Sequence, residues 1–168
     1  MENALCFEDF EIGQLLMRLK KGPMTTTHIM RWSSAIENWH RIHYDQRFAI
    51  DHDKLPDVLV NGSWKQHILA QVMKDGLGPN GWLWKIKFRY ERMNPAGDTI
   101  FAEAEVAKKE EIAGLGFVTC RVSLKDQNGE DNTSGWAIGV LPLRGGRAVP
   151  YPFVVEPTYA GLDLPKYC

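Results

Sequence analysis

Apolar residues in the first half of the chain recur at helical spacing. Between Ile29 and Trp39 they stand three or four positions apart, which places them on one face of a helix. A threonine cluster at 25–27 precedes them, and a threonine hydroxyl can cap a helix by accepting a free backbone N–H. We therefore expect a first helix that begins after this cluster and ends around residues 38–41.

A second apolar stripe, between Trp64 and Met73, predicts a longer helix. Asn61 or Ser63 can serve as its N-cap, and Gly76 is a helix-stop signal. A proline and several acidic residues between the two predicted helices indicate a loop.

After the second helix the period of the pattern changes to two. Apolar and mostly charged side chains alternate over 82–90, which predicts a strand with one aromatic face. An Asn-Gly pair at 128–129 marks a turn before the last of the strands. Three more alternating segments follow the first, at 100–106, 118–124 and 136–140.

These elements make an α+β chain, with helices first and strands after them. One curved antiparallel sheet wrapped round the second helix would bury the apolar stripe of that helix under the aromatic faces of the strands. Such a sheet has open edges that can pair with a second copy, so we expect a homodimer or a higher homo-oligomer. Residues 7–16 could form a short strand or a loop, and residues 144–168 are expected to form an extended tail on the surface or on a partner.

The composition fits a single globular domain over residues 1–168, with its core at about 7–143. With 44% hydrophobic and 24% charged residues, disorder is disfavoured. A formal net charge of −1 gives no basic excess for nucleic acid. No apolar run reaches the roughly 18 residues of a membrane helix, and no signal peptide is expected at the N-terminus. The three cysteines, Cys6, Cys120 and Cys168, form no CxxC pair, so we expect a protein of the reducing cytoplasm.

The densest group of titratable side chains is the segment ENWHRIHYD at 37–45. Its two histidines, His40 and His43, are natural proton carriers near neutral pH. With Asp45 and His52 they could also supply metal ligands, but their spacing matches no specific metal motif, and we predict no metal site. The alternative interpretation is structural, with both histidines as satisfied residues that follow a helix end.

Four segments are informative together. They are FEDFEIGQ at 7–14, SSAIENWHRIHYDQRFA at 33–49, LPDVLVNGSWKQHILAQ at 55–71 and the strand that begins at Trp82. In this order they resemble the MaoC-type hydratases and dehydratases, a family with the hot-dog fold. The hexapeptide HRIHYD is the most specific part and is similar to a bacterial acyl-dehydratase branch. The resemblance covers most of the chain up to about residue 143 and implies an antiparallel sheet wrapped round a central helix.

The (R)-specific enoyl-CoA hydratases of this family carry the signature Asp-x-Asn-Pro-Ile/Leu-His, in which the Asp and the His form the catalytic pair. On this chain the His position is His43, and the Asp position is Asn38. The family's Asn and Pro positions hold His40 and Arg41. An amide cannot take a proton, so Asn38 can only orient the reacting water or the thioester. The resemblance then implies that His43 acts as base and acid in turn, or with help from a nearby carboxylate.

The resemblance also implies where the substrate binds. It places the donor for the thioester oxygen at Gly62, and the backbone N–H groups of Gly62 and Ser63 at a helix start suit the negative charge that develops there. The alternative is that this glycine only forms a helix-start turn. We expect His40 and Asp45, which flank His43, to contact the substrate as well. The substrate implied is an acyl-CoA, and no metal or redox cofactor is expected.

The function implied is a lyase of fatty acid metabolism that reversibly hydrates a 2-enoyl-CoA to a 3-hydroxyacyl-CoA. Asn38 also favours an alternative, a non-catalytic hot-dog subunit of a hetero-oligomeric hydratase. A further alternative is an acyl-CoA thioesterase, because other hot-dog proteins hydrolyse acyl-CoA. Two groups of basic side chains are candidates for holding the CoA phosphates: Lys85, Lys87 and Arg89, or Arg144 and Arg147.

Overall fold

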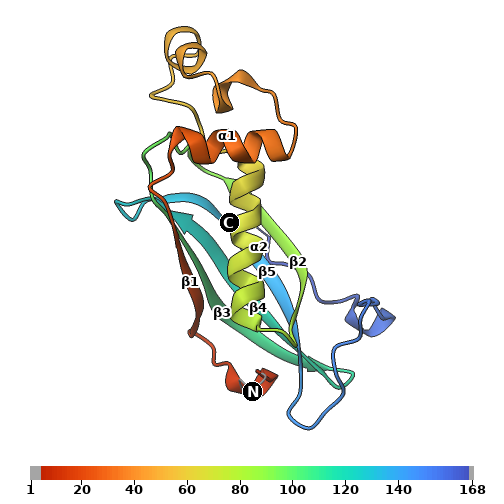
Figure 1. The fold of residues 1–168 in the computed structure, drawn as a ribbon. Helices are drawn as coiled ribbons and strands as arrows, with labels where there is room; N and C mark the ends of the chain where they lie inside the picture. Colours follow the sequence, from red (N-terminus) through yellow and green to blue (C-terminus); the bar gives the residue numbers. More distant parts are fainter. Residues whose placement is uncertain (1–4, 167–168) are drawn as a thin grey trace.

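A computed structural model describes residues 5–166. Its strands form one antiparallel sheet in the order β1-β3-β4-β5-β2, and the long helix α2 lies along one face of that sheet (Figure 1). The predicted plan of an antiparallel sheet wrapped round a central helix is therefore confirmed. The strands are β1 (Leu15–Lys21), β2 (Trp82–Tyr90), β3 (Ile100–Ile112), β4 (Leu115–Lys125) and β5 (Asp131–Pro142).

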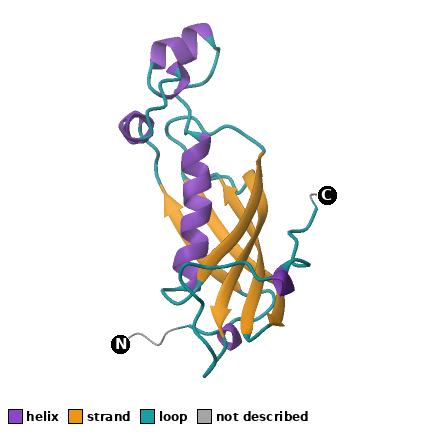
Figure 2. Ribbon diagram, turned by 90° about the vertical axis from the view of Figure 1, so that its right-hand side faces the viewer, coloured by secondary structure: helices purple, strands orange, loops and turns teal. Residues whose placement is uncertain are grey.

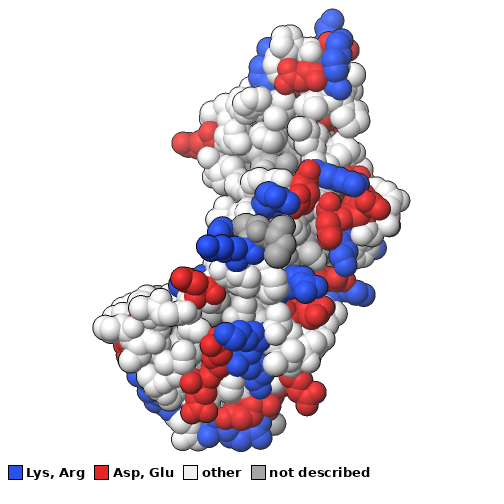
Figure 3. All heavy atoms as spheres, turned by 180° about the vertical axis from the view of Figure 1, so that it is seen from behind, with Lys and Arg blue, Asp and Glu red and all other residues white. Residues whose placement is uncertain are grey.

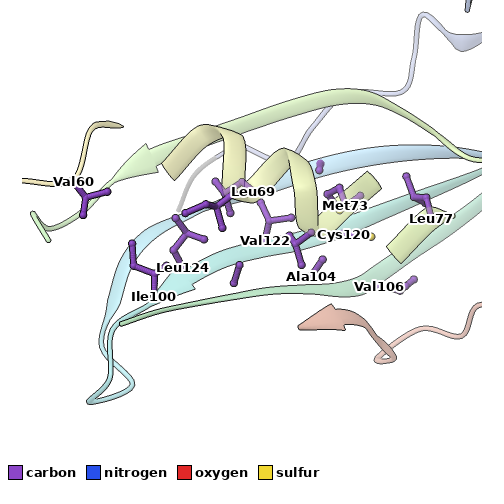
Figure 4. Close-up of a cluster of buried hydrophobic side chains, with 14 of the residues drawn as sticks. Val60, Leu69, Met73, Leu77, Ile100, Ala104, Val106, Cys120, Val122 and Leu124 are labelled. Atoms are coloured by element: carbon purple, nitrogen blue, oxygen red, sulfur yellow. The ribbon is translucent and has the colours of Figure 1, made fainter. Parts of the chain in front are cut away.

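Helix α2 (Gly62–Leu77) carries the predicted apolar stripe into the core. Its buried side chains pack against the small and branched residues that β3 and β4 turn toward it (Figure 4). Burying one large aliphatic side chain stabilises a fold by roughly 1.5–3 kcal/mol, so this stripe fixes the helix firmly on the sheet. The buried residues of the stripe are Ile68, Leu69, Val72, Met73 and Leu77.

The first helix, α1 (Thr26–Ala35), is shorter than predicted. Thr25 is the N-cap, as expected, and its hydroxyl accepts from the His28 backbone N–H at 3.2 Å. The predicted end around 38–41 is wrong. The chain leaves the helix because Glu37 adopts a left-handed conformation with φ of 53°.

The expectation that Gly76 ends the second helix is also wrong. Gly76 lies inside α2, and a Cβ atom there would stand 2.7 Å from the Leu16 side chain of β1. The glycine therefore lets the edge strand approach the helix closely. The helix ends at Leu77, and Gly78 follows it with φ of 73°.

Two features of the sheet differ from the sequence pattern. Strand β1 adds a fifth strand that pairs with β3, and it begins only at Leu15, near the end of segment 7–16, whose pattern allows either a strand or a loop. Strand β2 contains a register shift between Leu83 and Lys85. Such an irregularity changes the face of the sheet to which neighbouring side chains point. Ile86 therefore packs in the core with α2, whereas Trp84 packs in a second hydrophobic cluster.

That second cluster joins the C-terminal tail to the sheet. Tyr159 and Leu162 are buried there, and Trp84 packs against Phe117 and Tyr159. In Figure 2 the tail crosses the sheet on the side away from α2. The described part of the tail thus packs on the protein's own sheet, whereas Cys168 lies outside the described residues. Positive and negative side chains are interspersed on this side of the molecule (Figure 3), and within residues 5–166 no helix is long and apolar enough to cross a membrane.

One charged residue lies inside the core. Lys65, in the first turns of α2, exposes only 3% of its surface. Its ammonium donates to the backbone carbonyl oxygen of Arg92 at 2.6 Å, and within residues 5–166 no carboxylate forms an ion pair with it. Burial lowers the pKa of this ammonium to about 8, and the charge of Asp98 opposes only part of that effect.

This buried lysine makes stability depend on pH in the alkaline range. Between about pH 8 and the usual lysine value of about 10.4, the unfolded chain holds a proton that the folded chain has released, so the free energy of unfolding rises with pH. The slope is at most about 1.4 kcal/mol per pH unit. In chemical denaturation from pH 7 to pH 10, the free energy of unfolding of the wild type should rise relative to that of Lys65→Met. The difference isolates Lys65, because burial also raises the pKa of Cys120 to about 12, and this opposing effect is the same in both proteins. An equal rise in both proteins would contradict the assignment to Lys65.

Candidate active site

The segment between α1 and α2 projects beyond the end of the sheet (Figure 1) and contains the histidine cluster. Two contacts with Leu59 join this segment to the residues just before α2. The Leu59 N–H donates to the Ile42 carbonyl oxygen at 2.9 Å, and the Leu59 carbonyl oxygen lies 2.8 Å from Nδ1 of His43. Because Leu59 and Gly62 are only three residues apart, their Cα atoms are at most about 11 Å apart. The fold thus brings His43 to the chain that leads into the start of α2.

The contact with Leu59 determines the state of the His43 ring. A carbonyl oxygen only accepts hydrogen bonds, so Nδ1 carries the proton and Nε2 of the neutral ring keeps its lone pair. Burial lowers the pKa of His43 most strongly. The hydrogen bond to Leu59 raises it, and the charge of His40 lowers it further. The half-buried imidazole is therefore a neutral base at pH 7.

Asn38 and His40 occupy the loop before that imidazole. The Asn38 side-chain oxygen accepts from the His40 backbone N–H at 3.1 Å, which leaves its amide NH₂ as the group that can donate outward. The His40 ring is exposed, and its centroid lies 6.1 Å from that of His43. The loop thus brings a hydrogen-bond donor and a second imidazole near the proposed base, although no contact joins Asn38 to His43 in the described chain.

Asp45 has a local structural role. Its carboxylate accepts from the Arg41 guanidinium at 2.8 Å and from the Phe48 backbone N–H at 2.9 Å. The hydrogen bond from Phe48 lowers the pKa of Asp45 most, and the one from Arg41 adds to it. The carboxylate is therefore ionised at neutral pH and holds the turn that follows His43. A contact with substrate stays a prediction for this residue.

Gly62 and Ser63 form the first turn of α2, where backbone N–H groups lack partners within the helix. The Ser63 hydroxyl accepts from the Trp32 indole N–H at 3.0 Å, so α1 is joined to this turn. The helix dipole adds positive potential at the same end. The predicted pair of amides therefore lies where an anionic oxygen is stabilised. In the described chain His43 and Gly62 share no hydrogen bond, and their link is the segment that begins at Leu59.

Two side chains of this turn make contacts that the sequence pattern did not predict. Asn61 occupies the N-cap position but is fully buried, and its side-chain oxygen accepts from the Ser33 hydroxyl at 3.2 Å instead of capping the helix. Tyr90, the last residue of β2, donates its hydroxyl to the Gly62 carbonyl oxygen at 2.6 Å. The alternating pattern predicted the strand but carried no signal that its last ring would reach α2.

Most of the basic side chains considered for the CoA phosphates already have partners within the protein. Lys85 donates to the Leu162 carbonyl oxygen, and Arg89 pairs with Glu91. Arg144 forms an ion pair with Asp9 of the N-terminal segment, and Arg147 forms one with Glu156 of the tail. The prediction of a phosphate site on these residues stays untested. Among the described side chains, no group of three or more His, Cys, Asp or Glu is arranged to hold a metal ion.

Comparison with known proteins finds a family whose model matches part of this chain. A family model described as hydroxyacyl-thioester dehydratase type 2 matches residues 17–98. That stretch contains both the histidine cluster and all of α2. No curated protein matches the chain in sequence.

Several solved structures share the fold. The unliganded (R)-hydratase PhaJ1 from Pseudomonas aeruginosa has a TM-score of 0.74 at 16% identity, covering 83% of this chain and 86% of its own. The (R)-hydratase from A. caviae involved in PHA biosynthesis has a TM-score of 0.71 at 20% identity, covering 80% and 99%. The ChsH1-ChsH2 complex from Mycobacterium tuberculosis has a TM-score of 0.68 at 22% identity, covering 78% and 98%.

These similarities confirm the predicted hot-dog fold. The family match supports a hydratase or dehydratase activity as a reaction class, without specifying the substrate. The identities are low, so the solved structures speak for the fold alone. The chain thus has the hot-dog fold, and its residues 17–98 are similar to the hydroxyacyl-thioester dehydratases of type 2.

Proposed function

We propose that this protein catalyses the reversible hydration of a 2-enoyl-CoA to a 3-hydroxyacyl-CoA. The observation that carries the proposal is the His43 ring, whose Nδ1 proton is held by the Leu59 carbonyl oxygen so that Nε2 is a free base near the start of α2. The match to the hydroxyacyl-thioester dehydratase model supports the reaction class.

One imidazole can balance the proton transfers of this reaction. In hydration, Nε2 of His43 takes a proton from water while the water oxygen bonds to C3 of the enoyl thioester. The electrons of the C2–C3 double bond move toward the thioester oxygen and form an enolate. The imidazolium then returns its proton to C2, and the carbonyl is restored. Dehydration runs through the same steps in reverse, so the net change is one water and no other proton donor is required.

The enolate oxygen carries the charge that the site must stabilise. In our proposal, the Gly62 N–H holds this oxygen and the Ser63 N–H assists, because both donors lie at the positive end of the α2 dipole. Asn38 orients the water through its free amide NH₂, since its oxygen is already bonded to His40. His40 and Asp45 are proposed to contact the substrate.

The assembly and the substrate carrier belong to the same proposal. CoA is the substrate carrier, and no further cofactor takes part. A homodimer is supported by large apolar side chains that are exposed around the projecting segment and at the open β2 edge, such as Trp39 at 58% and Tyr90 at 48% exposure. A cytoplasmic location remains a prediction from cysteine usage.

Asn38 favours a second candidate function, a non-catalytic subunit that supports an active hot-dog partner. One of the similar structures is itself a complex of two proteins, ChsH1 and ChsH2. In that case the isolated protein would be inactive and would gain activity only with a second hot-dog chain. A thioesterase would instead release free thiol from acyl-CoA.

The central prediction concerns His43. We expect His43→Ala to lower kcat/KM for crotonyl-CoA or a longer 2-enoyl-CoA by at least about 100-fold, because general acid–base catalysis accelerates a reaction by about 10²–10⁴-fold. Loss of the enoyl absorbance measures the rate. His52→Gln is the matched control, because the exposed His52 bonds to the neighbouring Asp53, stacks on the Phe48 ring and has no role in the proposed reaction. An unchanged rate in His43→Ala would overturn the assignment.

Asn38→Asp separates a weakened enzyme from a supporting subunit. A carboxylate at this position could share the proton transfers with His43, so we expect the hydration rate to rise about tenfold or more. Size-exclusion chromatography checks that the assembly is unchanged. If the wild type and this variant are both inactive, and mixing with a second hot-dog hydratase chain brings activity, the supporting-subunit function is correct instead.

The hydration rate should depend on pH through the same ring. Only the neutral form of His43 can accept a proton, so kcat/KM should fall with acid around a midpoint below the usual histidine pKa of about 6.5. NMR titration of the His43 ring should give a matching midpoint. His40→Gln should raise that midpoint, because it removes a positive neighbour. A midpoint above 6.5 in the wild type would contradict the burial of the ring.

A further inference from the structure

We infer that Tyr90 is a positioning residue for the amides at the start of α2. Its hydroxyl fixes and polarises the peptide group that joins Gly62 to Ser63. The inference rests on the proposed function, because it assigns a catalytic effect to the amides that would hold the thioester oxygen. It adds a residue from the end of β2 to a site that otherwise comes from α2 and the segment before it.

The hydrogen bond acts on the right peptide group. The Tyr90 O–H donates to the Gly62 carbonyl oxygen at 2.6 Å, and this carbonyl belongs to the same peptide unit as the Ser63 N–H. A donor on the oxygen of a peptide draws electron density away from its nitrogen, so the N–H becomes a stronger donor. The same bond also fixes the tilt of that peptide plane. The stronger N–H donor and the fixed peptide plane both belong to the first turn of α2.

Gly62 is a glycine because the Tyr90 ring lies against it. A Cβ atom built on Gly62 would stand 3.0 Å from both Cζ and the hydroxyl oxygen of Tyr90. This approach is tighter than nine in ten real Cβ contacts, so a side chain here would require the Tyr90 ring to shift by a few tenths of an ångström. The absence of a side chain therefore creates the seat for the tyrosine. The backbone conformation of this residue is helical, so conformational freedom does not explain the glycine.

The ring is held in this seat from the core side. The buried Lys65 ammonium lies 5.9 Å from the centroid of the Tyr90 ring and bonds to the Arg92 carbonyl oxygen, two residues beyond Tyr90. The Phe88 ring packs edge-on at 5.3 Å, and the backbone of Tyr90 pairs with Thr133 of β5. The hydroxyl itself stays protonated at neutral pH, because the ordinary pKa of tyrosine is about 10 and partial burial raises the pKa of Tyr90 further. These contacts make Tyr90 a fixed donor at the edge of the sheet.

A structural role alone predicts something different from a positioning role. If the hydroxyl only stabilises the fold, its removal lowers the melting temperature and leaves kcat of the folded protein unchanged. If it polarises the Ser63 amide, its removal also weakens the stabilisation of the enolate. Losing an oxyanion donor outright costs about 10²–10³ in kcat, so weakening one through its own peptide group should cost about tenfold.

The first arm of the test needs no activity. In ¹⁵N-labelled protein, Tyr90→Phe should move the Ser63 amide resonance upfield in ¹⁵N, because the nitrogen shift follows hydrogen bonding at the oxygen of the same peptide. Tyr151→Phe is the matched control. Tyr151 lies near the other end of α2, 86% exposed, and its hydroxyl makes no hydrogen bond with residues 5–166. An unmoved Ser63 resonance in Tyr90→Phe overturns the inference.

The second arm is kinetic. With a 2-enoyl-CoA, Tyr90→Phe should lower kcat about tenfold and change KM less than threefold, whereas Tyr151→Phe should match the wild type. Lys65→Met should also lower kcat, and the double variant should lose less than the product of the two single effects, because Lys65 acts on the peptide group through the Tyr90 ring. An unchanged kcat together with a moved Ser63 resonance shows that Tyr90 has only a structural role.

The two arms also separate this inference from the proposed function. If the wild type turns over no enoyl thioester, the proposed function fails, and the catalytic role of Tyr90 fails with it. The NMR arm would then still report whether the hydrogen bond polarises the Ser63 amide. If the wild type is active and His43→Ala is not, but Tyr90→Phe keeps the full kcat, only the inference about Tyr90 is wrong.

Discussion

The packing of α2 on the sheet is the interaction on which the rest of the structure depends. The buried stripe from Ile68 to Leu77 fixes the axis and rotation of the helix against β3 and β4. Because the helix cannot slide or turn without exposing that stripe, its first turn is held at one place at the end of the sheet. A backbone amide can serve as a preorganised donor only when it is held in this way. The apolar core thus determines where an anionic oxygen can be stabilised.

The polar side chains at that end of the core carry a cost that the apolar stripe offsets. A buried ammonium at Lys65 is unfavourable, and it also lies near the positive end of the helix dipole. Asn61 keeps a buried side-chain N–H that has no partner within residues 5–166. Both residues adjoin the first turn of α2. Unfavourable burial of this kind, concentrated at one end of an otherwise apolar core, is typical of a site shaped for chemistry more than for stability.

The sequence determined the elements far better than their ends and contacts. The period-two segments predicted four strands because alternation follows directly from a half-buried sheet, and the stripe of α2 was equally plain. The stop signal at Gly76 misled because a glycine that permits close packing of Leu16 looks the same in sequence as one that ends a helix. His43 was predicted as a site residue from its motif, and that role stays a prediction. Its partner, the Leu59 carbonyl, and the contact of Tyr90 with Gly62 were not predicted, because backbone groups and tertiary contacts leave no trace in residue spacing.

The amide at position 38 bears on mechanism more than on fold. Hydration moves one proton from water to C2, and the same imidazole can carry it if Nε2 reaches both atoms from one side of the double bond. The Leu59 carbonyl favours this, because it holds the proton on Nδ1 and stabilises the imidazolium that forms in between. An aspartic acid at this position could protonate the departing hydroxide and lower the barrier, yet it is not needed for the protons to balance. An enzyme with Asn38 would therefore be slower than one with an aspartate there, and its water and product would still enter and leave by the same steps.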